Sequence, residues 1–320
     1  MKSFKFRNVL IAGGTGLLGT NLTEKMSAFK KIKLQSSYLT TKPPKHLKKF
    51  YKKYNFLNWK DCIKSTKKKD LVIICAVKAG GIKFMKKNPT KSMTDNLAIR
   101  SNLFEACKIN NVKKVIWISS STAYPIKKKP IKEFEMNYDK KTYDEYIITG
   151  WVYRFLEKLA EFYLNKKELN INIIRVSNIY GPYDNFSENF SHVIPSLIKK
   201  IIYKNKVLKV WGNKSVIRDF VFVEDLVEAI ILISLLKKNI SPINFSSGNP
   251  TTIWQLTNLL LKISKKKLKV VFSQKKLSSA QYRVLDNAKF NKIFRNFKRT
   301  SLKSGLQKTF KWYKENEKKR

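Results

Sequence analysis

The sequence predicts an α/β protein built on a doubly wound parallel sheet, with a smaller, interleaved C-terminal domain. Three observations predict this class: short apolar runs of strand length, helical stretches between them, and a glycine-rich turn directly after the first run. Apolar runs without polar alternation are typical of strands buried on both faces of a parallel sheet. With 320 residues, the chain can form one large domain or two interleaved ones.

The first half of the chain alternates strands and helices, which favours right-handed parallel connections. Apolar runs predict strands at 8–12, 32–35, 71–76, 115–119 and 171–176. Helical patterns run from the glycine turn to about 29, and over 89–109 and 151–166.

The pattern changes after about residue 180. A loop is expected over 181–192, and further helices and strands follow it. The helices are expected at 193–203, 224–236 and 302–316, and the strands at 207–211 and 242–245. From residue 251 on, amphipathic helix and short strand alternate. We therefore predict one domain of 1–180 plus about 220–250, and a second of about 181–219 plus 251–320.

The charge is unusual, with 67 basic and 22 acidic residues and a net charge of +45. The lysines are spread along the whole chain, and neither an arginine-rich patch nor a nucleic-acid motif accompanies them. We interpret the excess as a compositional bias and predict no nucleic-acid partner. A positive field would still concentrate an anionic substrate. Binding of a polyanion remains a remote alternative.

Cysteine, histidine and hydropathy patterns exclude several classes. The three cysteines and two histidines lack metal-ligand spacing, so no metal site is predicted. No apolar run approaches the roughly 20 residues of a membrane helix. The N-terminal stretch lacks the cleavage site of a signal peptide. These patterns predict a reduced, cytoplasmic protein without a membrane span.

Glycines at positions 13, 16 and 19 follow the first strand and open a helix. The first permits a tight turn, the second lets backbone approach a diphosphate, and the third lets helix pack closely on strand. Amide groups at the helix start then face the phosphates. The loop predicts a dinucleotide site with these contacts: Gly13, Thr15, Gly16, Leu17, Leu18 and Gly19.

The second strand indicates which dinucleotide binds. An acidic residue that would hold the adenosine ribose is expected about 20 residues beyond the loop, and it is absent. The strand instead ends with Gln35, Ser36, Ser37 and Tyr38, followed by Lys42. Hydroxyl groups and a cation suit a 2′-phosphate, so NADP is favoured over NAD, with Ser36 as a contact.

Several segments, in this order, are highly specific. They are AVKAGGI (76–82), NLAIRSN (96–102), SSSTAYP (119–125), NIYGPYDNF (178–186), SHVIPSLI (191–198), VWGNKSVIRDFVFVEDL (210–226) and VLDNAKFNKI (284–293). Over nearly its whole length the chain resembles the extended short-chain dehydrogenases/reductases, also called the NAD-dependent epimerase/dehydratase family. It most resembles the branch of the GDP-L-fucose synthases.

The resemblance implies a Rossmann fold and a reductase, epimerase or dehydrogenase acting at carbon 4 of a nucleotide-linked sugar, GDP-linked in this branch. It also implies a homodimer and a role in surface polysaccharide biosynthesis. The first predicted domain would bind the dinucleotide and the second the nucleotide sugar. Further implied cofactor contacts are Ala76, Lys78, Asn96, Ser119, Tyr153 and Val176. Implied substrate contacts are Asn178, His192, Trp211, Arg218 and Arg283.

The resemblance breaks at the catalytic pair. The family carries Tyr-x-x-x-Lys on the helix before the NIYGP loop, and here Thr149 and Tyr153 occupy the two positions. In the family the tyrosine exchanges a proton with the sugar oxygen, and the lysine lowers the pKa of that tyrosine and binds the nicotinamide ribose. Tyr146, one helical turn before Thr149, could replace the tyrosine or could be an ordinary loop residue.

A second departure concerns the epimerase chemistry, for which the family uses a cysteine and a histidine. His192 matches the histidine, but Thr122 stands at the cysteine position. Ser120 and Thr122 instead resemble the hydroxyl pair that binds the reacting sugar oxygen in wider relatives. Two functions stay open. One is an enzyme whose proton relay uses Thr149, Tyr153 or Tyr146. The other is a catalytically impaired relative that binds sugar nucleotide and cofactor.

Overall fold

The computed structural model describes residues 4–78, 89–187, 191–273 and 280–317. Residues 79–82 of the AVKAGGI segment therefore lie outside the described part. In the described part, no helix is both long and apolar enough to cross a bilayer.

A seven-stranded sheet forms the centre of the molecule, and all its neighbouring strands are parallel. Its order is β11-β6-β5-β4-β1-β2-β3. Every residue of β4 and β6 is buried, as expected for strands covered on both faces. The strands are β1 (Asn8–Ala12), β2 (Lys33–Tyr38), β3 (Tyr51–Lys53), β4 (Leu71–Ile74), β5 (Lys114–Ser120), β6 (Ile171–Val176) and β11 (Ile243–Phe245).

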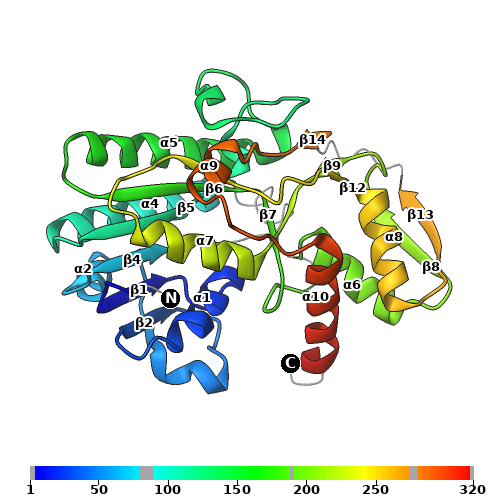
Figure 1. Cartoon of the computed structure of the whole chain (residues 1–320), viewed down its shortest axis with the longest axis horizontal. Coiled ribbons are helices and arrows are strands. Elements are labelled where there is room, and N and C mark those ends of the chain that lie inside the picture. Colours follow the sequence, from blue (N-terminus) through cyan, green and yellow to red (C-terminus); the bar gives the residue numbers. More distant parts are fainter. Residues whose placement is uncertain (1–3, 79–88, 188–190, 274–279, 318–320) are drawn as a thin grey trace.

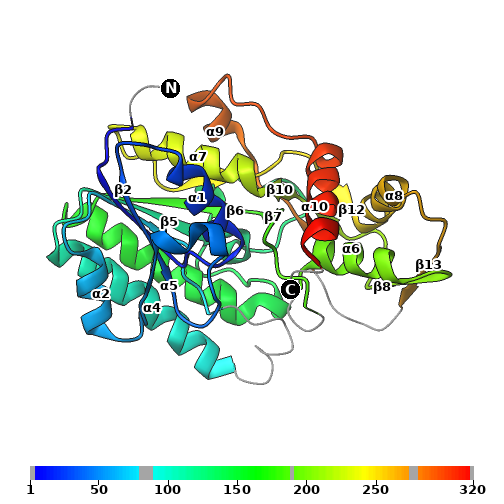
Figure 2. The same cartoon turned by 90° about the horizontal axis from the view of Figure 1, so that it is seen from below.

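Helices cover both faces of this sheet, each over its own apolar core (Figures 1 and 2). One face carries α1 (Leu17–Ser27) and α7 (Val223–Leu235), which contact each other. The other carries α2 (Trp59–Thr66), α4 (Pro89–Ile109) and α5 (Ile147–Asn165), packed in that order. The prediction of a doubly wound parallel sheet is confirmed.

A smaller group of elements lies beside the sheet, to the right in both views (Figures 1 and 2). It has a third apolar core. Its larger elements are α6 (Val193–Tyr203), β8 (Val207–Trp211), α8 (Ile253–Ser264), β13 (Lys269–Ser273) and α10 (Leu302–Asn316).

Short elements connect this group to the sheet. Strand β7 pairs with β10, and β9 pairs with both β12 and β14. The short strands are β7 (Asn178–Tyr180), β9 (Ile217–Arg218), β10 (Phe220–Phe222), β12 (Thr251–Thr252) and β14 (Tyr282–Arg283). Within the described residues, the remaining helices are α9 (Ala288–Ile293) and the 3-10 turns η1 (Lys45–Phe50), η2 (Ser121–Ala123), η3 (Glu133–Glu135) and η4 (Asp144–Tyr146).

Several element boundaries differ from the sequence prediction. The second strand covers 33–38 rather than 32–35, and α5 begins at Ile147 rather than at 151. Sequence patterns did not indicate β3 and α2, although Asn58 caps α2 by accepting a hydrogen bond from Lys60. The division into two domains stays a prediction. Helix α9, from the predicted second domain, packs against β11 of the large sheet.

Candidate active site

The glycine loop is shaped by close backbone contacts. Gly13 has a φ of +89°, and a Cβ there would lie 2.6 Å from the Cα of Ala76. Its amide donates to Ser37 Oγ at 2.8 Å, and the amide of Gly14 donates to Ser37 O at 2.9 Å. Tyr51 Oη donates to Gly14 O at 2.8 Å. Neither Ser37 nor Tyr51 was a predicted site residue. For Ser37, the only signal in the sequence is the polar end of β2.

The start of α1 is open toward solvent. Gly16 caps the helix without a side-chain hydrogen bond, and the first turn has no acidic residue. A Cβ on Gly16 would meet nothing closer than 3.8 Å, whereas one on Gly19 would lie 2.1 Å from Gly13 O. Leu18 is buried in the core, so only its backbone is available to a ligand. This helix start, which has no side-chain cap, fits a diphosphate.

Other predicted cofactor residues have mainly supporting contacts. Ser36 is fully buried, and its hydroxyl lies 2.6 Å from that of Thr23. Asn96 holds the end of the β4 segment, because it accepts from Lys78 N at 3.0 Å and donates to Lys78 O at 3.1 Å. The Lys78 ammonium pairs with Asp95 at 2.6 Å. Their contact with a dinucleotide stays a prediction, as it does for the half-buried Thr15 and Leu17.

The end of β5 carries the hydroxyl pair. Thr122 Oγ1 donates to Ser120 Oγ at 3.0 Å, and Thr122 N donates to the same oxygen at 3.2 Å. Ser120 lies opposite Val176 in the β5–β6 register. Helix α5 begins against this turn, because a Cβ on Gly150 would lie 2.8 Å from Thr122 O. Thr149, the preceding residue, therefore lies on the helix turn beside the hydroxyl pair.

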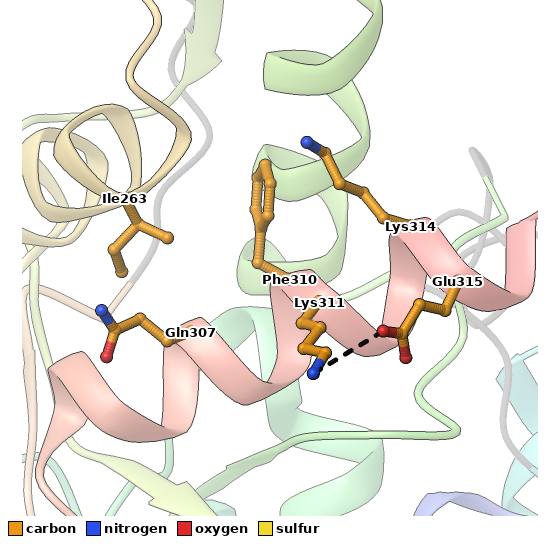
Figure 3. Close-up of a pocket in the computed structure, with 6 residues that line it drawn as sticks. All are labelled: Ile263, Gln307, Phe310, Lys311, Lys314 and Glu315. Atoms are coloured by element: carbon orange, nitrogen blue, oxygen red, sulfur yellow. Dashed lines mark ion pairs between the residues drawn. The ribbon is translucent and has the colours of Figure 1, made fainter.

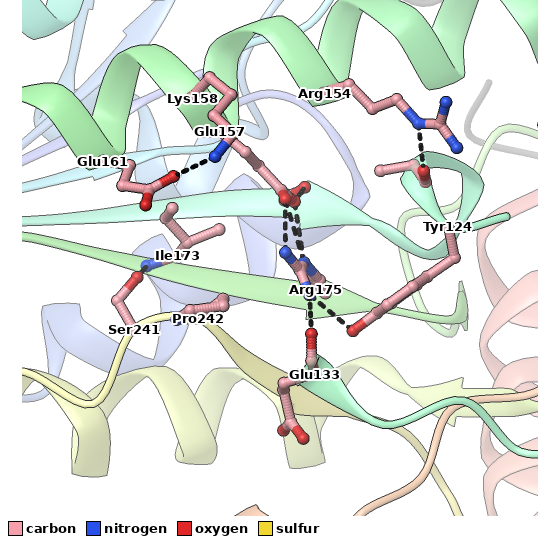
Figure 4. A network of polar contacts seen from close by, with 12 residues as sticks. Tyr124, Glu133, Arg154, Glu157, Lys158, Glu161, Ile173, Arg175, Ser241 and Pro242 are labelled. Carbon is pink, nitrogen blue, oxygen red and sulfur yellow. Dashed lines mark hydrogen bonds and ion pairs between the residues drawn. The ribbon is translucent and has the colours of Figure 1, made fainter. Parts of the chain in front are cut away.

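A buried ionic network fixes α5 to the sheet (Figure 4). Arg175 of β6 is 2% exposed and Glu157 of α5 is 1% exposed, and their closest bond is 2.7 Å. Arg175 also donates to Tyr124 Oη at 2.7 Å, and Ser119 donates to Glu157. Arg154 Nε donates to the carbonyl of residue 123 in η2 at 2.8 Å. Sequence analysis did not identify this network, which positions α5 against the hydroxyl pair.

Two arginines face each other on neighbouring short strands. Arg218 of β9 is directly opposite Arg283 of β14 in the parallel register. Both are at least nine-tenths buried. In the described part of the chain, Nε and Nη1 of Arg283 have no hydrogen-bond partner. Its Nη2 donates to Asn178 Oδ1, and Asn178 Nδ2 donates to Asp219 O at 2.8 Å. Paired positions on neighbouring strands therefore carry two cations, a charge that suits a doubly charged anion such as a diphosphate.

The arginine pair reaches α5 through Tyr146. The guanidinium of Arg283 lies 4.6 Å from the centroid of that ring, a cation–π contact. Tyr146 is the N-cap residue of α5, and Thr149 is on the first turn of that helix. Because Tyr146 also contacts Arg283, it connects the arginines to the turn that carries Thr149. The structure therefore brings Asn178, Arg218 and Arg283 together beside the start of α5.

The other two predicted substrate residues are exposed. His192 caps α6, its side chain is 76% exposed, and its Nδ1 lies 3.8 Å from Asp184 Oδ1. Asp184 raises the pKa of the imidazole above its ordinary value, and the charge of Arg283 opposes this. Trp211 ends β8 with 60% exposure, and Lys200 lies over its ring at 5.1 Å.

A separate hollow of about 370 Å³ lies between α8 and α10 (Figure 3). Lys311 and Glu315 of α10, which both line it, form an ion pair at 3.8 Å. None of its lining residues belongs to the predicted site. The candidate active site is the region that contains the glycine loop, the ends of β4 and β5, the start of α5 and the Arg218–Arg283 pair beside it.

The fold and these residues define a dinucleotide-binding α/β protein of the short-chain dehydrogenase/reductase type. Residues 9–244 match the model of the NAD dependent epimerase/dehydratase family. The chain belongs to that family, which confirms the resemblance found in the sequence.

Curated relatives cover almost the whole chain. GDP-L-fucose synthase of Escherichia coli K12 is 27% identical, over 97% of this chain and 98% of that protein. GDP-L-colitose synthase of Yersinia pseudotuberculosis is 28% identical, over 95% and 97%.

Solved structures show the same fold. UDP-glucose 4-epimerase of Thermotoga maritima, solved with UDP-glucose, has a TM-score of 0.85 at 21% identity, covering 97% of this chain and 99% of its own. A GDP-L-fucose synthetase of Naegleria fowleri, solved with NADP, has a TM-score of 0.83 at 21% identity, covering 98% and 94%.

Proposed function

We propose that this protein is an NAD(P)-dependent enzyme that acts at carbon 4 of a GDP-linked hexose or a related sugar, as a reductase/epimerase or a dehydrogenase. The observation that carries the proposal is the contact between Arg283 and Tyr146. This contact connects two parts of the site. One is the arginine pair, which suits a diphosphate, and the other is the start of α5, which lies against the Ser120–Thr122 hydroxyl pair.

The described residues divide the work between binding and orientation. Arg218 and Arg283 bind the sugar-linked diphosphate, and Asn178 holds Arg283 in place. The hydroxyls of Ser120 and Thr122 orient the oxygen at carbon 4. The bound nicotinamide supplies the hydride chemistry. Thr149, Tyr153 or Tyr146 exchanges the proton.

NADP is the preferred cofactor in this proposal. Its support is the absence of an acidic residue at the end of β2 and the NADP bound to the Naegleria fowleri relative. The preference for a GDP-linked sugar is supported by the GDP-L-fucose and GDP-L-colitose synthases among the relatives.

The test is turnover of purified protein with nucleotide sugars. With NADPH and a GDP-linked 4-keto-6-deoxy sugar, we expect the absorbance of reduced nicotinamide to fall and a reduced sugar to form. A matched control is Arg283→Gln, which should raise KM for the sugar nucleotide and leave NADPH affinity unchanged. Absence of turnover with GDP-, UDP- and dTDP-linked sugars in both directions would remove the proposal.

The second candidate is a catalytically impaired relative that still binds both ligands. It is favoured by Thr149 and Tyr153 at the positions of the family pair. The double variant Thr149→Tyr/Tyr153→Lys discriminates between the two. A large gain in turnover supports the impaired relative, whereas a loss supports an enzyme with a different proton relay.

We also propose that the protein is a homodimer formed through α5. Ile147, Trp151 and Phe155 are 44%, 45% and 56% exposed and are spaced by four residues, so they form one apolar stripe. Light scattering should give twice the chain mass, and Trp151→Glu/Phe155→Glu should give the monomer. Phe134→Glu is the control, because Phe134 is 81% exposed in η3 and lies off this stripe. A wild-type monomer at micromolar concentration would contradict the dimer.

The cellular role forms the last part of the proposal. We place the enzyme in the cytoplasm, in the synthesis of a surface polysaccharide. Its three cysteines are free thiols, which suits a reducing compartment. Cell fractionation and glycan analysis of a strain lacking the protein test this, and an unchanged surface glycan would count against it.

A further inference from the structure

Tyr153, at the lysine position of the family motif, lies against a buried arginine, Arg100. The Tyr153 ring also stacks on Trp117 of β5, with centroids 6.0 Å apart and planes at 29°. The guanidinium of Arg100 lies 5.1 Å from the ring centroid, and Arg100 Nη2 donates to Tyr153 Oη at 3.5 Å. Arg100 is on α4, so this contact joins α4 to α5, two of the helices that cover one face of the sheet.

Arg100 is a buried cation. It is 2% exposed, and its Nη1 donates to Asn96 O at 3.0 Å and to Asn96 Oδ1 at 3.2 Å. Among the described residues, no carboxylate forms an ion pair with it. Burial lowers the pKa of Arg100 and Tyr153 opposes this, but a guanidinium remains protonated at neutral pH. A buried charge without a carboxylate partner is unfavourable unless something else compensates it.

The same network reaches the end of β4. Asn96, which accepts from Arg100, also accepts from the backbone N–H of Lys78 and donates to its carbonyl. Arg100, Asn96 and the segment after β4 therefore form one connected unit. Its other end is Tyr153 Oη, on the helix that carries Thr149. The buried charge lies between the predicted cofactor segment and the position of the missing lysine.

Resting on the proposed function, we infer that Arg100 and Tyr153 together replace the lysine of the family pair. Arg100 supplies the positive charge from α4, and Tyr153 presents a polarised hydroxyl where the lysine ammonium would otherwise be. Tyr153 is the group that contacts the cofactor ribose. Arg100 is a positioning residue that acts through Tyr153. The positive charge that the family has on α5 is therefore on α4 in this chain, and it acts on the cofactor through the Tyr153 hydroxyl.

The inference predicts how NADPH binding responds when the charge is removed or moved. Without any sugar present, Arg100→Gln should weaken NADPH binding by about tenfold, because a charge-assisted hydrogen bond is lost. Arg100→Lys should stay within about threefold of wild type. Tyr153→Phe should weaken binding by several fold. Fluorescence titration of NADPH measures all three, and melting temperatures report folding.

A charge relocation provides the decisive comparison. Tyr153→Lys alone places two cations side by side and should weaken folding and binding. Arg100→Gln/Tyr153→Lys returns a single cation to α5 and should restore NADPH affinity to within about threefold of wild type. Lys108→Gln, which removes a half-buried charge at the C-terminal end of α4, is the control and should bind NADPH normally.

Each outcome either supports or overturns the inference that Arg100 and Tyr153 replace the lysine. If Arg100→Gln and Tyr153→Phe fold and bind NADPH as wild type does, the inference is overturned and Arg100 is structural only. The inference is also overturned if the double variant shows the sum of the two losses. If Arg100→Gln does not fold, Tyr153→Phe and Arg100→Lys carry the test. If the charge relocation restores binding while no sugar is turned over, the proposed function fails and the inference about NADPH holds.

Discussion

Replacing Gly16 with alanine should separate cofactor binding from folding. Gly16 has φ −77° and ψ 171°, a conformation that alanine adopts without strain. Its new methyl group would meet no atom closer than 3.8 Å. An alanine cap costs about 1 kcal/mol relative to a good one. The more restricted unfolded chain returns roughly 0.4–1 kcal/mol. The melting temperature should therefore change by no more than about 4 °C.

Binding should change far more, because the methyl group points into the open space at the start of α1. A phosphate that approaches the bare amides there would lose at least one charge-assisted hydrogen bond, worth about 1.5–3 kcal/mol. That loss corresponds to NADPH affinity about 10- to 150-fold weaker.

Gly19→Ala is the matched control, because its Cβ would overlap backbone instead of open space. The Cβ would lie 2.1 Å from Gly13 O and 2.7 Å from Gly14 Cα. The helix must shift, and we expect a loss of about 1–3 kcal/mol in stability together with loss of binding. NADPH fluorescence titration and differential scanning fluorimetry measure both variants. Gly16→Ala that binds NADPH within twofold of wild type would refute the assignment of the loop.

Three further predictions concern the charged groups. Glu157→Gln leaves the buried Arg175 without its carboxylate and should cost about 3–5 kcal/mol, seen as a lower urea midpoint; an unchanged midpoint would show that the network is not stabilising. Asp184 raises the pKa of His192, so this pair stabilises the fold below about pH 6.5 and loses that contribution as pH rises through the raised value. Asp184→Asn should abolish the slope, and an identical slope would contradict the pairing. Burial lowers the pKa of Lys114 to about 8, against about 10.4 in the unfolded chain. The free energy of unfolding should therefore rise between these two pH values, because the unfolded chain binds the extra proton there. Lys114→Met should flatten this rise in urea melts recorded as a function of pH.

The fold was predictable where one stretch of chain determines its own structure. The mainly apolar runs became β1, β4, β5 and β6, and Gly13 and Gly19 each have a local steric reason that the spacing predicts. The stretch 45–66 was missed because lysine-rich, irregular sequence hides β3 and α2. Tyr51 was missed as a site residue for the same reason, because it lies on β3. Its support of Gly14 could not be foreseen without the strand that carries it.

The candidate site was predictable in composition but not in contacts. The resemblance identified Arg218 and Arg283, yet only the β9–β14 pairing shows that they are neighbours. Lys78 was expected at the cofactor, and the structure adds that Asn96 holds its backbone while Asp95 pairs with its ammonium. Such pairings depend on tertiary packing, which spacing along the chain does not encode.

The loss of the family pair is best interpreted against what surrounds it. The elements that position the pair are intact: Gly150 still packs on Thr122, and Glu157 still joins Arg175 beneath α5. At the pair itself two side chains differ, Thr149 and Tyr153, and a buried guanidinium, Arg100, lies against the second of them. A site that no longer bound the cofactor would not need a desolvated cation at this position, because such a charge destabilises the fold unless it is compensated. The placement of Arg100 therefore favours a retained cofactor site, which both proposed functions require.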